Sequence, residues 1–176
     1  IDTIAKLGAK GCFLANQLHE EEVRSIFEHT KTDLFVQIHG VQYISHSKRK
    51  LLSNYFEFNQ IEHDHDYSSN IVMKVSDSEH ISHIYEDEFG THIFTQNELC
   101  LKDYIDVFHI QYGYIETLYL EDQYTLDLID FYRSDLTYND LVNQYPTHHY
   151  DTGFDNTVDD LVIIELKRDG NVDSPV

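Results

Sequence analysis

The chain has 176 residues, of which 41% are hydrophobic, and its 32 acidic and 12 basic side chains give a formal net charge of -20. This acidity argues against direct binding of nucleic acid or anionic membranes, because phosphate recognition rests on clustered Lys and Arg. The attractive partners of such a surface are cations and basic proteins. No apolar run reaches the roughly 18 residues that a membrane span needs, so the sequence predicts a cytoplasmic protein.

One domain is expected across residues 1–176, since a chain of this length buries a single sizeable core. The chain opens on Ile1 rather than Met, so its ends are expected to be those of a processed or incomplete sequence. The two cysteines, Cys12 and Cys100, show no metal-binding or redox spacing. They are therefore predicted to be free thiols in a reducing compartment.

The first part of the chain is predicted to hold one helix and several strands. Asn16 can cap a helix that runs to about Thr30, because Val23, Ile26 and Phe27 recur at helical spacing. Turn residues then separate short runs of residues that favour β-structure. The predicted strands cover residues 34–39, 41–45, 54–58, 71–75, 80–85 and 91–95.

The second part is predicted to alternate in the same way between helix and sheet. The spacing of Leu101, Tyr104 and Phe108 favours a helix over residues 97–108. The remaining predicted elements are a hairpin of strands 110–120 and 124–132, a short helix at 138–145, a polar loop at 147–160 and a buried strand at 161–164. Together these elements predict an α+β fold of mostly antiparallel sheet with two or three packing helices.

The leading candidate for a site is the pair Glu165 and Lys167, which follows the apolar run 161–164. Residues two apart in a strand lie on the same face, so the carboxylate and the amine are expected side by side. The carboxylate can hold a divalent cation such as Mg or Mn, and the amine can steady an anionic substrate. The alternative interpretation is an exposed ion pair where the strand reaches solvent.

Glu165-Leu166-Lys167 resembles the second half of the motif of PD-(D/E)xK nucleases. In that family an upstream Asp completes the metal site, and Asp155, Asp159 and Asp160 are the candidates for its place. This resemblance implies a metal-dependent nuclease.

A second resemblance spreads over more of the chain. Glu165-Leu166-Lys167 is followed by Ser174-Pro175, residues 112–117 and 124–127 suggest paired strands, and Tyr55-Phe56-Glu57 lies upstream. These features resemble VTC-type polyphosphate polymerase domains, which are similar to CYTH triphosphate-tunnel proteins. The resemblance implies that the sheet closes into a tunnel-like barrel.

The same resemblance implies that the domain acts on or binds a phosphate-rich small molecule with Mg or Mn. By this comparison Lys167 and Glu165 would be catalytic, Lys74 and Lys6 would bind substrate, and Glu165 and Asp127 would hold the metal. The three lysines are expected to converge inside the barrel.

Two alternatives stay open beside an active tunnel domain. Tyr114 and Gln123-Tyr124 stand where that family carries arginines, so a degenerate domain with altered or lost activity is one of them. The other is an acidic binding protein, of the DNA-mimic or nuclease-immunity type, that blocks a basic nucleic-acid enzyme. The carboxylate-rich segments 57–66, 76–88 and 151–160 would then imitate phosphates.

The 12 histidines raise the question of a metal site. His63 and His65 would lie on one face of an extended segment, and His80, His83 and His148-His149 add further nitrogen donors. None of these has a recognised zinc spacing. The favoured interpretation is that they are exposed or hydrogen-bonded without metal.

Overall fold

The computed structural model describes residues 1–62, 71–74 and 81–154, and these have the predicted α+β fold. The helices are α1 (Asp2–Lys6), α2 (Glu20–His29), α3 (Leu51–Asn59), α4 (Asp122–Arg133), α5 (Tyr138–Gln144) and the 3-10 turn η1 (Lys102–Tyr104). The strands are β1 (Gly11–Phe13), β2 (Asp33–Ser47), β3 (Ile71–Lys74), β4 (Ile81–Asp87), β5 (Gly90–Cys100), β6 (Tyr112–Ile115) and β7 (Tyr150–Asp151). Within these ranges, no helix has the length and apolar character to cross a membrane.

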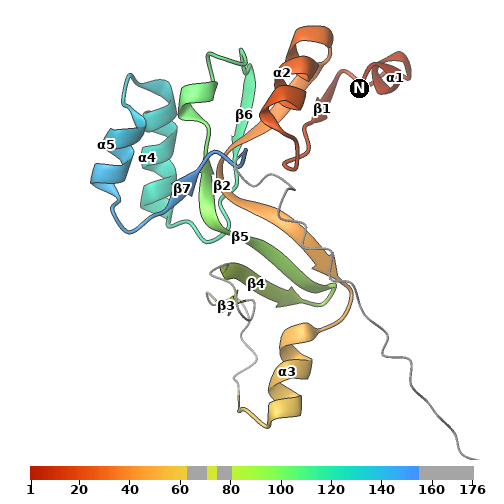
Figure 1. The fold of residues 1–176 in the computed structure, drawn as a ribbon, viewed down its shortest axis with the longest axis vertical. Helices are drawn as coiled ribbons and strands as arrows, with labels where there is room; N and C mark the ends of the chain where they lie inside the picture. The colour runs from red at the N-terminus through yellow and green to blue at the C-terminus, as the bar shows by residue number, and fades with distance from the viewer. Residues whose placement is uncertain (63–70, 75–80, 155–176) are drawn as a thin grey trace, which may run out of the picture.

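The long strand β2 organises the sheet. Its first part lies between β1 and β6, and both neighbours run parallel to it. Its second part pairs with β5 in the antiparallel sense, and β4 and β3 continue the sheet from β5. β7 adds a short parallel pairing to the C-terminal part of β5. The described strands therefore form a parallel region and an antiparallel region that share β2 (Figure 1).

The two regions meet at Gly40, in the middle of β2. Gly40 has a φ of 95°, and a Cβ atom there would lie 2.1 Å from the carbonyl oxygen of Glu116, just after β6. The backbone N–H of Glu116 donates to the carbonyl oxygen of His39 at 2.9 Å, which holds the two segments together. Only glycine fits this backbone without a shift. The strands predicted at 34–39 and 41–45 are one strand, β2, which continues through Gly40.

Two hydrophobic clusters cover the parallel region and the end of β5. In the first, Leu34, Val36 and Ile38 on one face of β2 pack with Val23 of α2 and with Phe108. The second cluster lies where α4 and α5 meet the end of β5, and its buried members are Cys100, Tyr124, Leu128, Phe131 and Leu141. Helices α2 and α4 are thus fixed by apolar residues at helical spacing.

Four aromatic rings form a row on the parallel region, here called the aromatic row: Phe13, Phe35, Tyr112 and Tyr114. Phe35 stacks on Phe13 and on Tyr112, with ring centroids 5.1 and 4.9 Å apart. Phe13 is 70% exposed and Tyr112 is 44% exposed. Parallel sheets are usually covered on both faces. Among the described residues, the aromatic row is therefore an open surface.

The N-terminus of α3 is capped by Glu86, a buried residue of β4. Its carboxylate accepts hydrogen bonds from the backbone N–H of Leu52 at 2.8 Å and of Ser53 at 3.3 Å. The hydroxyl of Thr91 also donates to it, at 3.0 Å. The first N–H groups of a helix have no partner within the helix, so Glu86 sets where α3 begins.

The structure corrects several predicted elements. The described strands do not close into a barrel, because the strand order ends at β1 on one side and at β3 on the other. The strands predicted at 54–58 and 124–132 are the helices α3 and α4. The helix predicted at 97–108 is wrong, since β5 continues to Cys100 and only the 3-10 turn η1 follows within that range. The helix predicted at 138–145 is confirmed as α5.

Candidate functional site

Six polar side chains gather where the parallel part of β2 ends, and this group is the strongest candidate for a site. Ligand sites in sheets with parallel strands form at the carboxyl ends of those strands. His39 occupies that end of β2, and its partners come from β5, α4 and the segment around β7. The group, here called the His39 cluster, consists of His39, Glu98, Tyr124, Tyr132, His148 and Tyr150.

His39 is the centre of the cluster and is fully buried. Its Nε2 atom lies 3.1 Å from Oε2 of Glu98 and 2.9 Å from the hydroxyl of Tyr124. Its Nδ1 atom lies 3.1 Å from the hydroxyl of Tyr132. Burial lowers the pKa of His39 below its usual value and outweighs the neighbouring Glu98, which raises it. The neutral imidazole is therefore the main form at neutral pH.

Glu98 joins the buried imidazole to a partly exposed one. It accepts hydrogen bonds from the hydroxyl of Tyr124 at 3.0 Å and from Nδ1 of His148 at 2.6 Å. Burial would raise the pKa of Glu98, but the hydrogen bonds with His39 and His148 outweigh burial, so its pKa is lowered. Glu98 is thus a buried carboxylate held by several donors.

The hydrogen-bond partners of His39 leave room for one more proton. The hydroxyl of Tyr132 donates to the carbonyl oxygen of Ile38 at 2.6 Å, so its oxygen is an acceptor toward Nδ1 of His39. Glu98 is an acceptor toward Nε2. A neutral imidazole has one N–H and can donate to only one of these two partners. If His39 were protonated, each of its two N–H groups would therefore have an acceptor, although burial disfavours the charge.

The tyrosines of the cluster stay protonated. Burial raises the pKa of Tyr124, of Tyr132 and of Tyr150 well above the usual value. The hydroxyl of Tyr124 lies 2.9 Å from that of Tyr150, so the network continues from His39 toward β7. The cluster can thus move protons between a buried imidazole and the surface, which is the chemistry of a general acid or base.

A shallow hollow of about 480 Å³ opens onto this cluster. Its volume is within the range of small-molecule sites, roughly 300–1,000 Å³. The side chain of His148 is 25% exposed and forms part of the wall. The polar residues that line this hollow, here called the His148 hollow, are Gln96, Asn97, Tyr138, His148, His149 and Tyr150. A molecule in the hollow would therefore contact two members of the His39 cluster.

Cys100 lies next to the cluster but is a poor nucleophile. Its Sγ atom is 3.7 Å from the hydroxyl of Tyr132, and the residue is buried. Burial raises the pKa of the Cys100 thiol, so the reactive thiolate is disfavoured. Both cysteines are free, as predicted. The chemistry of this region belongs to the imidazoles, the carboxylate and the hydroxyl groups.

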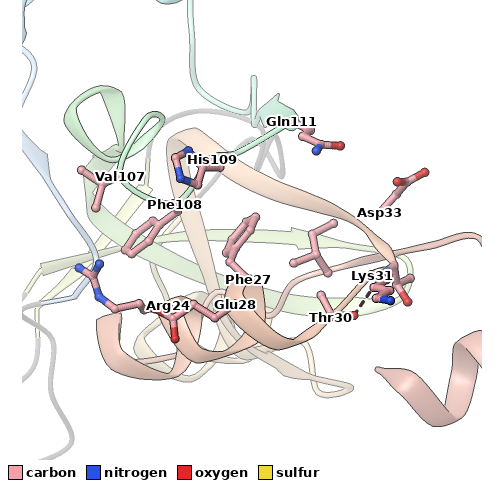
Figure 2. Close-up of a pocket in the computed structure, with 12 residues that line it drawn as sticks. Arg24, Phe27, Glu28, Thr30, Lys31, Asp33, Val107, Phe108, His109 and Gln111 are labelled. Atoms are coloured by element: carbon pink, nitrogen blue, oxygen red, sulfur yellow. Dashed lines mark hydrogen bonds between the residues drawn. The ribbon is translucent and has the colours of Figure 1, made fainter.

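A second hollow, of about 390 Å³, lies at the other end of the parallel strands, beside Asp33 at the start of β2. Figure 2 shows Phe27 and Phe108 side by side in it, and their rings stack at a centroid distance of 6.1 Å. Arg24 lies 5.4 Å from the centroid of the Phe108 ring and also pairs with Glu20. Residues at this end of parallel strands usually serve stability.

The residues predicted as a site from sequence are not brought together in the described part of the chain. Glu165 and Lys167 lie outside the described residues. Lys6 ends α1 and Lys74 ends β3, at opposite ends of the molecule (Figure 1). Asp127, predicted as a metal ligand, lies on α4 and accepts hydrogen bonds from Gln123, Gln144 and Tyr145. It therefore ties α4 to α5.

The histidine prediction has a mixed outcome. His63, His65 and His80 lie outside the described residues. Among the residues that the structure does describe, no group of three or more His, Cys, Asp or Glu is arranged to hold a metal ion. His148 is hydrogen-bonded, as expected, but its partner is a buried carboxylate.

His39 and Glu98 were not predicted as site residues. One signal was present, because Gln37 and His39 alternate with Val36 and Ile38 in a strand, which placed a buried face and a polar face on β2. Glu98 gave no such signal, since it fell inside the helix predicted at 97–108.

The fold and the cluster define an α+β protein with a buried acid–base network. The family model of peptidase family U32 matches residues 1–161, and the chain belongs to this family. It is also similar to the tRNA hydroxylation protein P2 of Bacillus subtilis (strain 168), with 30% identity over 102 residues. That alignment covers 56% of this chain and 33% of the relative, so it spans about a third of the relative's length. No solved structure matches the chain.

The family match overturns the functions inferred from the two sequence resemblances. The chain belongs to family U32, so the interpretation as a VTC- or CYTH-like tunnel domain acting on polyphosphate is wrong. The alternatives of a PD-(D/E)xK nuclease and of an acidic DNA mimic are set aside on the same finding. The short Glu-x-Lys motif misled because three residues of this kind recur by chance in unrelated strands.

Proposed function

We propose that this chain takes part in the hydroxylation of tRNA and that the His39 cluster moves protons during that reaction. The observation that carries the proposal is the similarity to a relative whose name states tRNA hydroxylation. The cluster supports it, because it joins two imidazoles and a carboxylate that can exchange protons. To the described residues we assign only the proton transfers of this reaction.

The chemistry of hydroxylation gives such a network a task. Replacing a C–H group by C–OH is a two-electron oxidation. An oxygen donor of the peroxide class, supplied from outside the described residues, would give its terminal oxygen to the carbon as its O–O bond breaks and would leave as an alcohol or water after taking up a proton, while the proton of the C–H bond goes to a base. A base near the reacting carbon accepts that proton, and a buried His with paired nitrogens is suited to hold it. Because His39 is fully buried, the proton would reach it by relay through His148 and Glu98, on a ring that also faces the Tyr132 oxygen. His148 then links Glu98 to solvent.

Attack on a peptide bond by a thiol is less well supported. Covalent peptidase chemistry needs a nucleophile with a lowered pKa or an adjacent base. Cys100 is the thiol nearest to the cluster, and burial raises its pKa. An acid–base role suits the His39 cluster better than a role in peptide hydrolysis through this cysteine.

The charge of the chain constrains how tRNA would be held. A formal charge of -20 repels a phosphate backbone. The chain spans about a third of the relative's length, so the basic contacts are proposed to lie in other parts of the protein or in a partner. A basic protein partner and a divalent cation, both predicted from the sequence, would each offset this repulsion.

The test is the content of hydroxylated nucleosides in tRNA from the organism that carries the gene. Deleting the gene is expected to remove a nucleoside one oxygen atom heavier than its parent, measured by mass spectrometry of digested tRNA. Restoring the gene with Glu98→Gln should leave that nucleoside at or near the deletion level, because the amide keeps the shape and loses the carboxylate.

The control for that variant is Asp130→Asn, which makes the same chemical change at an exposed position of α4 outside the cluster. It should restore the nucleoside fully. Unchanged tRNA hydroxylation in the deletion strain would refute the proposed function.

A further inference from the structure

The His148 hollow is lined by neutral hydrogen-bonding groups in a strongly acidic protein. None of the eight described residues that line it is Lys, Arg, Asp or Glu. We propose that this hollow binds a single nucleobase turned out of an RNA strand. The inference rests on the proposed function and names the part of the substrate that reaches the cluster.

The lining argues against a charged ligand. A phosphate group is normally held by Arg or Lys, and the described wall supplies neither. A cation would need a carboxylate with free lone pairs, and the neighbouring carboxylate is Glu98. That carboxylate already faces donors from His39, Tyr124 and His148. A neutral polar molecule is the ligand that fits.

The aromatic walls favour a flat molecule. The rings of His148 and Tyr150 stack at 6.2 Å with an angle of 14° between their planes. Tyr138 meets Tyr150 edge-on, with centroids 6.0 Å apart. Aromatic side chains of this kind stack on unpaired bases in RNA-binding proteins. These three aromatic residues thus line the hollow, and such a lining suits a planar heterocycle.

Two amides supply the hydrogen bonds that a base edge requires. Asn97 is half-buried and Gln96 is exposed at the wall. Within the described residues, neither side chain makes a hydrogen bond to the protein, so both remain available to a ligand. Each amide carries a donor and an acceptor and can pair with the donor and acceptor edge of a base.

The position of the hollow agrees with chemistry on the base. His148 in its wall contacts Glu98 at 2.6 Å, and the Tyr150 hydroxyl contacts that of Tyr124 at 2.9 Å. A base in the hollow would therefore lie beside the groups that are proposed to move protons. Enzymes that modify a base must first take it out of the stack. An acidic protein that binds the base also avoids part of the repulsion that close contact with the phosphate backbone would cause.

The test is nuclear magnetic resonance of the full-length protein titrated with uridine, cytidine, adenosine and guanosine, which carry no phosphate. At least one nucleoside should shift the amide signals of Asn97, His149 and Tyr150. Asn97→Ala should weaken that binding about tenfold, since it removes a paired amide. Asn139→Ala, an exposed change on α5, should leave it unchanged.

The outcomes separate this inference from the proposed function. No shift up to the solubility of all four nucleosides, or binding of inorganic phosphate at these residues in their place, overturns the nucleobase site. If nucleosides bind here and deletion of the gene leaves tRNA hydroxylation intact, the site stands and the proposed function falls. If Glu98→Gln abolishes hydroxylation while Asn97→Ala leaves nucleoside binding unchanged, the hollow is wrongly assigned.

Discussion

Gly40 is one of the described glycines at which a positive φ coincides with a close backbone contact. Its φ of 95° is costly for any other residue, and a Cβ atom would collide with the carbonyl oxygen of Glu116 at 2.1 Å. Gly8 has a similar φ of 100°, but a Cβ there would meet nothing within 4 Å. Comparing alanine substitutions at Gly40 and Gly8 separates the cost of the positive φ from the cost of the contact between the added Cβ atom and the carbonyl oxygen of Glu116.

Gly40→Ala is therefore expected to destabilise the protein clearly more than Gly8→Ala. Backbone strain of this kind costs on the order of 1–3 kcal/mol, and Gly40→Ala adds the displacement of Glu116 to it. Urea unfolding of both variants measures the difference. Equal losses of stability would show that β2 and β6 separate at no cost.

His39 also gives the protein a specific dependence on pH. Its pKa is lowered from 6.5 in the folded state, so the unfolded state binds a proton first as the pH falls. The stability that the neutral imidazole contributes is present above pH 6.5 and is lost as the pH decreases toward the folded pKa. The maximum slope for one such group is about 1.4 kcal/mol per pH unit.

His39→Gln should reduce the decrease in unfolding free energy between pH 6.5 and pH 5. His149→Gln changes an exposed histidine and is the control. Denaturant unfolding at several pH values measures both slopes. A slope unchanged by His39→Gln would mean that the pKa of His39 is the same in the folded and the unfolded state.

At the scale of elements, the sequence was informative where local signals agreed. α5 was predicted as a short helix over residues 138–145, and in the structure a capping box of Thr137 and Asp140 begins it. α4 was predicted as a strand because its Tyr and Phe residues favour β-structure. Its buried residues Tyr124, Leu128 and Phe131 are spaced four and three apart, which is helical. Periodicity deserved more weight than residue preference there.

The candidate site was harder to predict than the elements. His39 and Glu98 are 59 residues apart, and only the pairing of β2 with β5 brings them together. His148 reaches Glu98 because β7 pairs with β5 beside it. No local pattern encodes such contacts, so a search for motifs led instead to Glu165 and Lys167.

α3 provides a test of an element that depends on a distant residue. Glu86 accepts from Leu52, Ser53 and Thr91. Glu86→Ala removes the acceptor of the Leu52 N–H, and a buried donor left unpaired costs about 1–3 kcal/mol, whereas the Thr91 hydroxyl can still donate to the carbonyl oxygen of Arg49. Unfolding by urea should become easier, and hydrogen exchange at Leu52 and Ser53 should accelerate. Glu88→Ala, at an exposed position in the following turn, should change neither.

At the scale of the whole molecule, the open surface of the parallel region is the feature that the sequence did not predict. The aromatic row contains Phe13, which is 70% exposed and stacks on Phe35. The chain spans about a third of the length of its curated relative. Contiguous exposed aromatic surface attracts apolar molecules, and the net charge of -20 keeps chains with such a surface apart by repulsion.

This combination predicts how the 176-residue chain behaves on its own. An apolar fluorescent dye should bind to the aromatic row, and Phe13→Ser should reduce its fluorescence by half or more. Leu7→Ser removes an apolar side chain that is 84% exposed and lies outside the row, so it should have little effect.

High salt screens the repulsion between chains, so self-association should increase with salt in the unmodified chain and less in Phe13→Ser. Equal dye binding by the two variants would mean that the row is not the apolar surface of this chain, and sedimentation that does not change with salt would remove the role given to charge.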